Sequence, residues 1–313
     1  MYNHLFGPVP SRRLGISLGV DLVPHKTCSL NCIYCECGRT TCLTLERKEY
    51  VSTAAILSEL KEFLKDNPRL DYITFSGAGE PTLHSGIGAI IGFIKKEFSH
   101  YKLALITNGI LFFLPGVRKE IKFVDLVLPS LDAASEQTFI KMNHPNSDLK
   151  IETIIKGLAD FQKNYNSKMW LEVFIVPGIN DAKEEITLLR QAIHRIRPTL
   201  VQLNSLDRPG TNSGVNPATE ETLQRVADFL DWETEIIAKF TPRNKIANYN
   251  IDIENTILQL IKRRPCTLDD LCSTLGKHHN EVNKYLDTLL DQKIIIAKKM
   301  ERGVFYESLN REI

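Results

Sequence analysis

The sequence lacks the features that would assign it to a membrane or a nucleic acid by composition alone. No apolar run approaches the roughly 20 residues that a membrane-spanning helix needs. Residues 1–10 are short and are broken by Gly7 and two prolines, which does not fit the apolar segment of a secretory signal peptide. The formal net charge is +1, so the whole chain has no electrostatic footprint for nucleic acid or anionic lipid.

Cysteine is also scarce outside one short segment. The 313 residues include seven cysteines, and five of them fall between Cys28 and Cys42. A cluster of this kind indicates metal binding rather than a disulfide framework. We therefore expect a cytoplasmic, reducing location and no membrane partner. The length predicts one large domain, or a large and a small one.

Three of the clustered cysteines have a distinctive spacing, Cys28-x-x-x-Cys32-x-x-Cys35, with Tyr34 just before the last. Three thiolates this close can bind three irons of a [4Fe–4S] cluster. Since such clusters are normally fully ligated by cysteine, a set of three predicts an open iron that binds a substrate or cofactor. The rival interpretations are a zinc knuckle or unrelated buried thiols. Structural zinc prefers four ligands in paired units, and no second pair or histidine is spaced nearby to complete such a set.

The middle of the chain alternates strand-like and helix-like segments. Strands are predicted at residues 18–24, 70–76, 101–107, 123–131, 169–176 and 200–204. Helices are predicted at 51–64, with Ser52 as N-cap, and at 86–98, 134–141, 151–165, 183–197 and 217–230. Six β/α units in series predict an α/β fold with a parallel sheet. Six units are too few for a full (β/α)₈ barrel, so we expect a partial (β/α)₆ TIM-like barrel.

The pattern changes near residue 230, which divides the chain into a barrel (1–232), a connector (233–250) and a C-terminal domain (251–313). Helices at 253–264, 268–275 and 280–292, followed by a β-hairpin over 294–308, predict a winged helix-turn-helix domain. This domain holds ten Lys/Arg and ten Asp/Glu, so it is formally neutral. A duplex binder should show a basic face, so the charge argues against DNA and favours docking of a substrate or partner.

Several further segments sharpen the interpretation. After the second predicted strand comes Ser76-Gly-Ala-Gly79-Glu80, and Thr107-Asn108-Gly109 and Ser130-Leu-Asp132 follow the next two. Residues 6–15, 38–40, 143–145 and 206–210 carry flanking motifs. With the cysteine motif, they make residues 4–232 resemble the radical S-adenosylmethionine (radical SAM) superfamily. The branch it resembles includes the archaeal enzymes that make the wyosine base of tRNA, and many uncharacterised iron–sulfur proteins.

The resemblance implies cofactors and an activity. Cys28, Cys32 and Cys35 would ligate a [4Fe–4S] cluster, and its open iron would chelate the methionine part of S-adenosylmethionine (SAM). An electron from a donor such as ferredoxin or flavodoxin would cleave SAM to a 5′-deoxyadenosyl radical, which abstracts hydrogen from a substrate. An RNA base or a peptide or protein is the favoured substrate, presented by the winged-helix domain.

The resemblance also implies contacts to SAM. Gly79 and Glu80 match the family's Gly-Gly-Glu motif, which holds the methionine amino group, although Ala78 replaces its first glycine. Asn108, Ser130 and Asp132 match positions that contact the ribose and the carboxylate, and Tyr34 adjoins the cluster. Base preferences leave simpler roles open, because Asn108 suits a left-handed turn and Ser130 and Asp132 suit helix caps.

For two further sets of residues, the sequence leaves two possible roles open. Cys37, Cys42, Cys266 and Cys272 would suffice for a second metal site, or they are free cysteines that act as small buried hydrophobes. Four arginines could hold an anionic group at the cavity or could be surface charge, which we favour for Arg13; the others are Arg12, Arg39 and Arg208. The competing class for the whole protein is a non-catalytic iron–sulfur or zinc regulator that binds DNA through residues 251–313.

Overall fold

The computed structural model describes most of the chain. The described residues are 2–11, 13–206, 210–212, 214–237, 253–277, 282, 285–286, 289–290, 292–300 and 302–309. Arg12, Arg208, most of the predicted connector and most of the predicted helix at 280–292 lie outside them.

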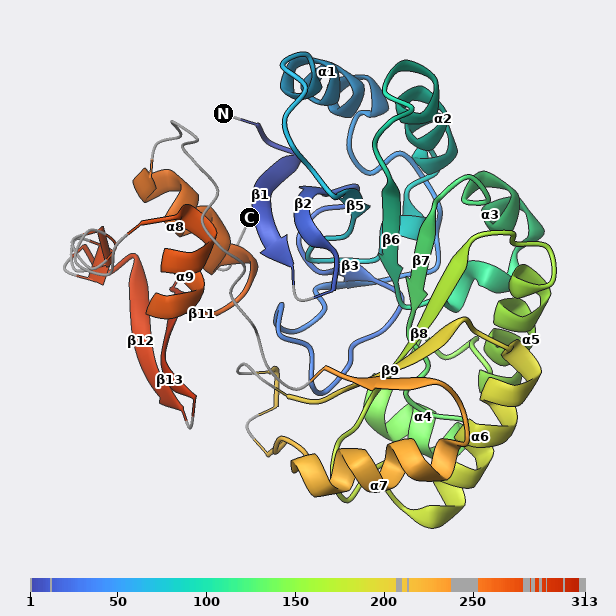
Figure 1. The fold of residues 1–313 in the computed structure, drawn as a ribbon. Helices are drawn as coiled ribbons and strands as arrows, with labels where there is room; N and C mark the ends of the chain where they lie inside the picture. The colour runs from blue at the N-terminus through green and yellow to red at the C-terminus, as the bar shows by residue number, and fades with distance from the viewer. Residues whose placement is uncertain are drawn as a thin grey trace.

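An eight-stranded sheet forms the centre of the fold, in the order β1-β2-β5-β6-β7-β8-β9-β10. Neighbouring strands are parallel, apart from β1 and β2, which form an antiparallel hairpin. The strands are β1 (Leu5–Ser11), β2 (Gly15–Val20), β5 (Tyr72–Phe75), β6 (Leu103–Thr107), β7 (Leu126–Pro129), β8 (Lys168–Phe174), β9 (Leu200–Asn204) and β10 (Thr234–Ile236). Figure 1 shows how the sheet curves while the helices stay on its outer side.

The six predicted parallel strands are confirmed as β2, β5, β6, β7, β8 and β9. Two further strands lie at the sheet edges. β1 pairs with β2, and β10 pairs in parallel with β9. The sheet therefore extends into residues 234–236, which the sequence assigned to the connector.

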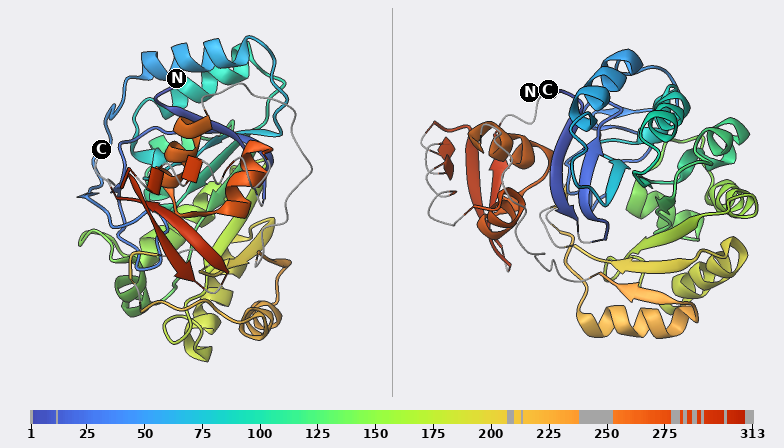
Figure 2. Two further views of the ribbon diagram at one scale, coloured as in Figure 1. Left: turned by 90° about the vertical axis from the view of Figure 1, so that its left-hand side faces the viewer. Right: turned by 45° about the horizontal axis from the view of Figure 1, so that its top comes forward.

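Seven helices follow the strands and cover the convex face of the sheet (Figure 2). They are α1 (Thr53–Leu64), α2 (Ile87–Glu97), α3 (Pro115–Glu120), α4 (Glu136–Asn143), α5 (Ile151–Gln162), α6 (Lys183–Ile196) and α7 (Glu220–Leu230), with short 3₁₀ turns at Pro81–Leu83 and Ile110–Phe113. Ser52 caps α1 as predicted, because its side chain accepts a hydrogen bond from the Ala55 amide. Short α3 was not predicted.

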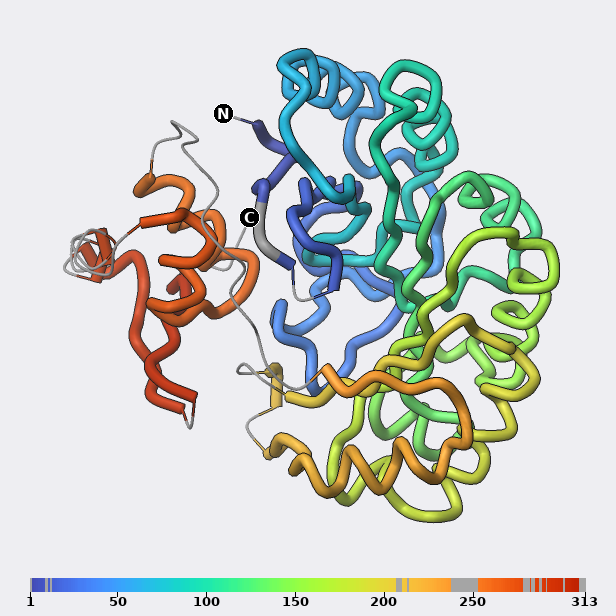
Figure 3. The backbone as a smooth tube through the Cα atoms, in the orientation of Figure 1, coloured from blue at the N-terminus to red at the C-terminus, as the bar shows by residue number. Residues whose placement is uncertain are grey.

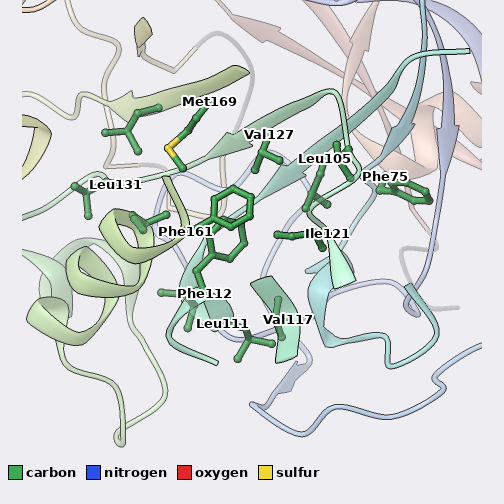
Figure 4. Packing of buried hydrophobic residues seen from close by; sticks show 14 of the residues in the cluster. Phe75, Leu105, Leu111, Phe112, Val117, Ile121, Val127, Leu131, Phe161 and Met169 are labelled. Carbon is green, nitrogen blue, oxygen red and sulfur yellow. The ribbon is translucent and has the colours of Figure 1, made fainter. Parts of the chain in front are cut away.

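The main hydrophobic core lies between the sheet and these helices. Buried strand residues such as Phe75 and Leu105 meet side chains from the surrounding helices and turns (Figure 4). Phe112 packs edge-on against Phe161 of α5, with ring centroids 4.9 Å apart. This core fixes the strand ends rigidly, and the loops that follow them build the site.

The cysteine loop leaves the carboxyl end of β2 and returns toward α1, a path that can be followed in Figure 3. Two short strands within it, β3 (Thr27–Cys28) and β4 (Cys42–Leu43), pair in parallel. The loop is also tied to its neighbours, since the Glu80 amide donates to the Thr27 carbonyl and the Asn31 amide donates to the Asn143 carbonyl. The cysteines thus sit on a loop that is fastened at several points.

The C-terminal region forms a separate unit with its own hydrophobic core. It contains α8 (Ile253–Arg263), β11 (Cys266–Thr267), α9 (Leu268–Leu275), β12 (Ile295–Met300) and β13 (Gly303–Ser308). The three strands form an antiparallel sheet in the order β11-β13-β12. Val282, Leu286 and Leu289, from the predicted third helix, are buried in this core.

The C-terminal unit lies beside β1 and β2 (Figures 1 and 2). Arg263 of α8 forms an ion pair with Asp21, which directly follows β2. The Arg263 guanidinium also lies over the Phe6 ring of β1, 3.9 Å from its centroid. In the described part of the chain, no helix is long and apolar enough to cross a membrane.

Candidate functional site

A cavity of about 210 Å³ opens where the parallel strands end. Its walls come from the cysteine loop and from the loops after β5, β6 and β7, together with residues of α4, α5 and β8. All nine predicted site residues line it: Cys28, Cys32, Tyr34, Cys35, Gly79, Glu80, Asn108, Ser130 and Asp132. The fold thus brings together residues that are up to 104 positions apart, as expected for the carboxyl ends of parallel strands.

Each of the three cysteine thiols lies close to one side-chain nitrogen donor, and the three donors come from different parts of the fold. The Asn108 amide lies 3.5 Å from Cys28 Sγ, and the Asn143 amide lies 3.4 Å from Cys32 Sγ. The Lys26 ammonium lies 3.0 Å from Cys35 Sγ. Hydrogen bonds to sulfur stabilise negative charge there and are a feature of iron–sulfur sites. The donor set therefore fits thiolates that hold a cluster.

The thiols differ in how readily they ionise. A hydrogen bond from the Cys37 thiol lowers the pKa of Cys35 to about 5, and the Lys26 ammonium acts in the same direction. Burial raises the pKa of Cys28 to about 11 and also raises the pKa of Cys32. Burial alone would lower the pKa of Lys26, but the negative charges of Cys35 and Cys28 outweigh it and raise that pKa. Metal ligation requires the thiolate, so Cys35 is prepared for it before any metal binds.

The geometry does not suit a single metal ion. Among the described residues, no group of three or more His, Cys, Asp or Glu side chains converges closely enough to hold one. A zinc ion would draw its ligands to about 2.3 Å from one point. An iron–sulfur cluster instead keeps each thiolate on a separate iron, so its ligands stand farther apart. The three thiols line one cavity without converging on a single point, an arrangement that the ligands of a cluster allow.

The four remaining cysteines do not form a second site. Cys266 and Cys272 are buried in the core of the C-terminal unit, whereas Cys42 is exposed. Cys37 adjoins Cys35 and points toward the Gly77 carbonyl. The hypothesis of a second metal site that joins all four is therefore wrong, and Cys266 and Cys272 act as small apolar side chains.

Glu80 ties two loops together beneath the cavity. Its Oε1 accepts hydrogen bonds from the Thr82 amide and hydroxyl and from the Thr107 hydroxyl at 2.6 Å. Its Oε2 accepts one from the Asn108 amide at 2.8 Å. Burial nevertheless raises the pKa of this carboxyl, which is 2% exposed. One oxygen is thus saturated, while the other keeps a lone pair for a further donor.

Gly79 is required by close packing. A Cβ atom at this position would collide with the Thr27 carbonyl oxygen and the Val23 side chain. The neighbouring Ala78 carbonyl accepts a hydrogen bond from the Lys26 amide at 2.8 Å. The loop after β5 therefore lies directly against the start of the cysteine loop.

Asp132 holds a buried network on the other side of the cavity. Its Oδ2 accepts hydrogen bonds from the Tyr34 hydroxyl and the Asn143 amide, and its Oδ1 accepts one from the Phe174 amide. Tyr34 stacks on Phe174, with ring centroids 4.0 Å apart. Because Asn143 also donates to Cys32, this carboxylate positions the cysteine loop. Ser130, by contrast, lines the cavity and makes no side-chain hydrogen bond to another described residue.

Two of the four arginines can be placed. Arg13 was predicted to be surface charge, and this is wrong: it turns inward from the β1–β2 hairpin and pairs with Glu172 of β8, which lines the cavity. Both side chains are under 20% exposed. Arg39 is exposed and does not line the cavity. Arg12 and Arg208 lie outside the described residues.

Sequence reasoning missed three residues of the site: Lys26, Asn143 and Glu172. Lys26 lies two positions before the first cysteine, but no spacing rule connects a lysine there with Cys35. Asn143 stands in one of the flanking motifs, which could have marked it. Glu172 lies between apolar residues of β8, and a charge within this apolar run was the available signal.

The chain is similar in sequence to several known proteins. The family model described as "Radical SAM superfamily" matches residues 22–189. A "UPF0026 protein" of Helicobacter pylori (strain J99) is 32% identical over 306 residues, which cover 96% of each chain. A protein of Brachyspira hyodysenteriae named "GTPase Obg" is 34% identical over 98% of this chain, which spans 45% of that protein's length.

Two further matches are more distant. A "Probable dual-specificity RNA methyltransferase RlmN" of Endomicrobium trichonymphae is 26% identical over 63% of this chain and 55% of its own. A crystal structure of a radical SAM methyltransferase from Sphaerobacter thermophilus superposes with a TM-score of 0.57 at 15% identity, covering 72% of this chain and 67% of that one. This likeness supports the partial-barrel fold.

Proposed function

Because the chain belongs to the radical SAM superfamily, we propose that it removes a hydrogen atom from an RNA base, with a peptide or protein side chain as the second candidate. The observation that carries the proposal is the single cavity lined by three cysteines and by every predicted SAM contact. Members of this superfamily bind a [4Fe–4S] cluster and SAM. Bound together, these groups supply a one-electron cleavage of SAM that yields a hydrogen-abstracting radical.

The residues of the cavity fit both groups. Cys28, Cys32 and Cys35 would hold the cluster, since each thiol already has a nitrogen donor. Glu80 would hold the amino group of SAM through Oε2, the oxygen with spare acceptor capacity. Ser130 would donate to the ribose or carboxylate of SAM. Asn108 would act indirectly, because its side chain is engaged with Cys28 and Ser29.

Apolar side chains would protect the reaction from water. Part of the cavity wall is formed by aliphatic and aromatic residues: Ile106, Ile110, Leu131, Phe139, Ile151 and Ile154. Most of them also belong to the main core, so they are held in place. A dry, rigid wall prevents a reactive intermediate from being quenched before it reaches the substrate.

The substrate class rests on similarity and on the C-terminal unit. One relative is named as an RNA methyltransferase, and the sequence motifs resemble those of the wyosine tRNA-modification branch. We propose that the C-terminal unit is a winged-helix module that presents the substrate, which its helices α8 and α9 and its β12–β13 hairpin support. An electron donor of the ferredoxin or flavodoxin type would serve the cluster.

The competing proposal, a DNA-binding regulator, is not favoured. The superfamily match covers more than half of the chain and concerns enzymes, and a regulator has no need of the loop that carries Gly79 and Glu80. The neutral charge of residues 251–313 also disfavours duplex binding.

The proposal is tested by supplying substrates to the reconstituted protein. Anaerobic protein, SAM and a strong reductant are incubated with total small RNA, or with a protein fraction from the source cells. An increase in 5′-deoxyadenosine release on addition of RNA, which is lost when the RNA is first treated with ribonuclease, supports the RNA assignment. Stimulation by the protein fraction alone would move the assignment to a peptide, and the absence of release under all conditions would contradict the enzyme.

A further inference from the structure

We propose that Lys26 is an electrostatic tuning residue, whose ammonium raises the reduction potential of the cluster held by the three cysteines. The inference rests on the proposed function, because it requires the cluster to be bound. It concerns a residue that neither the cysteine motif nor the SAM loop contains. Lys26 touches a cluster ligand and does not line the cavity in which the substrate would react.

The environment of Lys26 is unusual for a lysine. Lys26 is 3% exposed, and no other lysine or arginine among the described residues is as buried. Lysine is almost never fully buried unless it is paired. None of the ion pairs between described residues involves Lys26, and its nearest anionic partner is Cys35 Sγ at 3.0 Å. The buried charge is therefore balanced by sulfur.

The backbone holds Lys26 in this position. Its φ of 57° lies in the left-handed region, which a residue with a side chain rarely adopts. Its amide donates to the Ala78 carbonyl at 2.8 Å, and its carbonyl accepts from the amides of Thr41 and Cys42 at 3.1 and 3.2 Å. The peptide groups on both sides of Lys26 are thus hydrogen-bonded to neighbouring segments. A strained and clamped backbone is expected where a side chain must be aimed at a particular point.

Lys26 differs in charge from the other two side chains that donate to the cysteine sulfurs. Asn108 and Asn143 are neutral amides, and their distances to sulfur are longer, at 3.5 and 3.4 Å. A charged donor stabilises an anion about twice as strongly as a neutral one. Of the three contacts, the one from Lys26 should therefore dominate the electrostatics at the cluster.

The direction of the effect follows from the charge of each redox state. Reduction transfers one electron from the reductant to the cluster, and no bond is made or broken. The reduced state carries one more negative charge, so a nearby ammonium in a low-dielectric site stabilises it more than the oxidised state. Hydrogen bonds and net charge near the sulfurs are known to set such potentials.

A direct role in binding SAM does not fit the position. The residues that line the cavity include the three cysteines but not Lys26, so the ammonium approaches Cys35 from the protein side. The Lys26 ammonium would therefore act on a bound cluster through Cys35 rather than by contact with SAM.

The test compares Lys26→Met, Lys26→Gln and Lys26→Arg with the wild-type protein. Methionine removes the charge at similar length, glutamine keeps a neutral N–H donor, and arginine keeps the charge. Lys48→Met is the matched control, since Lys48 is half exposed and pairs with Glu46. Iron per chain is counted first, and the reduced fraction is then measured by electron paramagnetic resonance at a series of fixed potentials.

We expect the methionine and glutamine variants to show at least a tenfold lower ratio of reduced to oxidised cluster at the wild-type midpoint. For a one-electron couple, this corresponds to about 59 mV. The Lys26→Arg variant is not expected to differ from wild type by more than about threefold, and neither is the Lys48→Met control. An unchanged ratio in Lys26→Met with a full complement of iron would overturn the inference while leaving the proposed function intact.

Loss of the cluster is also informative. If both neutral variants lose iron and Lys26→Arg retains it, the positive charge is needed to hold the thiolates, which supports the electrostatic role. If all three variants lose iron equally, shape rather than charge is decisive and the inference fails. A wild-type protein that binds no iron at all would instead contradict the proposed function.

Discussion

Replacing Arg263 by methionine should loosen the C-terminal unit from the barrel. Arg263 is the residue of α8 that forms an ion pair with Asp21 and also lies over the Phe6 ring. Methionine has an unbranched apolar side chain of similar length. The change therefore removes the charge and the contact between the guanidinium and the Phe6 ring, while most of the packing remains. Lys262, its neighbour on α8, lines the same interface and provides the matched control.

The expected cost can be worked from the exposure of the pair. Removing one partner of a fully buried ion pair costs about 3–5 kcal/mol. Both side chains here are 20% exposed, so solvent screening reduces the cost to about 2 kcal/mol. The cation–π contact adds about 0.5–1 kcal/mol. Burial already raises the pKa of Asp21. Without Arg263, the Asp21 carboxylate can therefore take up a proton instead of remaining as an unpaired charge, which limits the total cost to about 3 kcal/mol.

The assay is urea unfolding followed by far-ultraviolet circular dichroism. Arg263→Met should lower the free energy of unfolding by about 3 kcal/mol, whereas Lys262→Met should change it by less than about 0.5 kcal/mol. The double variant Arg263→Met/Asp21→Asn should lose less unfolding free energy than the sum of the two single variants, because both single changes remove the same ion pair. Additive single effects, or an Arg263→Met protein as stable as wild type, would refute the reasoning.

Three further predictions concern the site. Gly77→Ala should weaken SAM binding about tenfold by equilibrium dialysis, because its Cβ would collide with Asp21 at a φ of 154°; Gly92→Ala, with open space around it, should not. Asn143→Ala should lower iron per chain after reconstitution, whereas the exposed Asn164→Ala should leave it unchanged. Burial raises the pKa of Asp132 to about 6, so its contribution to the stability of the metal-free protein is full below about pH 4 and is lost as the pH rises through 6. Asp132→Asn should remove up to about 3 kcal/mol of that pH dependence in urea unfolding; an unchanged pH profile would argue against it.

The parallel strands were predictable because each is a short apolar run between helix-like segments. The run at residues 200–204 became β9 without change, and Ser52 caps α1 as its position predicted. In barrel-like folds the functional residues gather at the carboxyl ends of the parallel strands. The nine predicted site residues do line one cavity there. Local pattern and topology were sufficient for this much.

The remaining features depend on contacts between distant segments. β1 contains two prolines, which argue against a strand, but β1 lies at an edge of the sheet, where missing amide donors are tolerated. The sequence around Arg13 suggests surface charge, because its partner Glu172 lies 159 positions away and only the folded hairpin brings the two together. β10 is three residues long, too short for a periodic pattern to reveal.

The roles of the acidic residues also needed the structure. Sequence resemblance predicts that Asp132 contacts SAM, and this stays a prediction; in the structure its oxygens accept hydrogen bonds from Tyr34, Asn143 and Phe174. Its side chain thus holds Tyr34 and Asn143 in place. Such a role depends on which donors the fold brings near, and no spacing rule in the sequence gives that.

The central claim is that Cys28, Cys32 and Cys35 hold a cluster at which SAM is cleaved. The most direct test is the release of 5′-deoxyadenosine by anaerobically reconstituted protein with SAM and a strong reductant. Wild-type protein and Cys42→Ala, which removes an exposed cysteine outside the cavity, should both release it. Cys32→Ala should not. Equal release from Cys32→Ala, or no release from wild-type protein that carries its full complement of iron, would contradict the account.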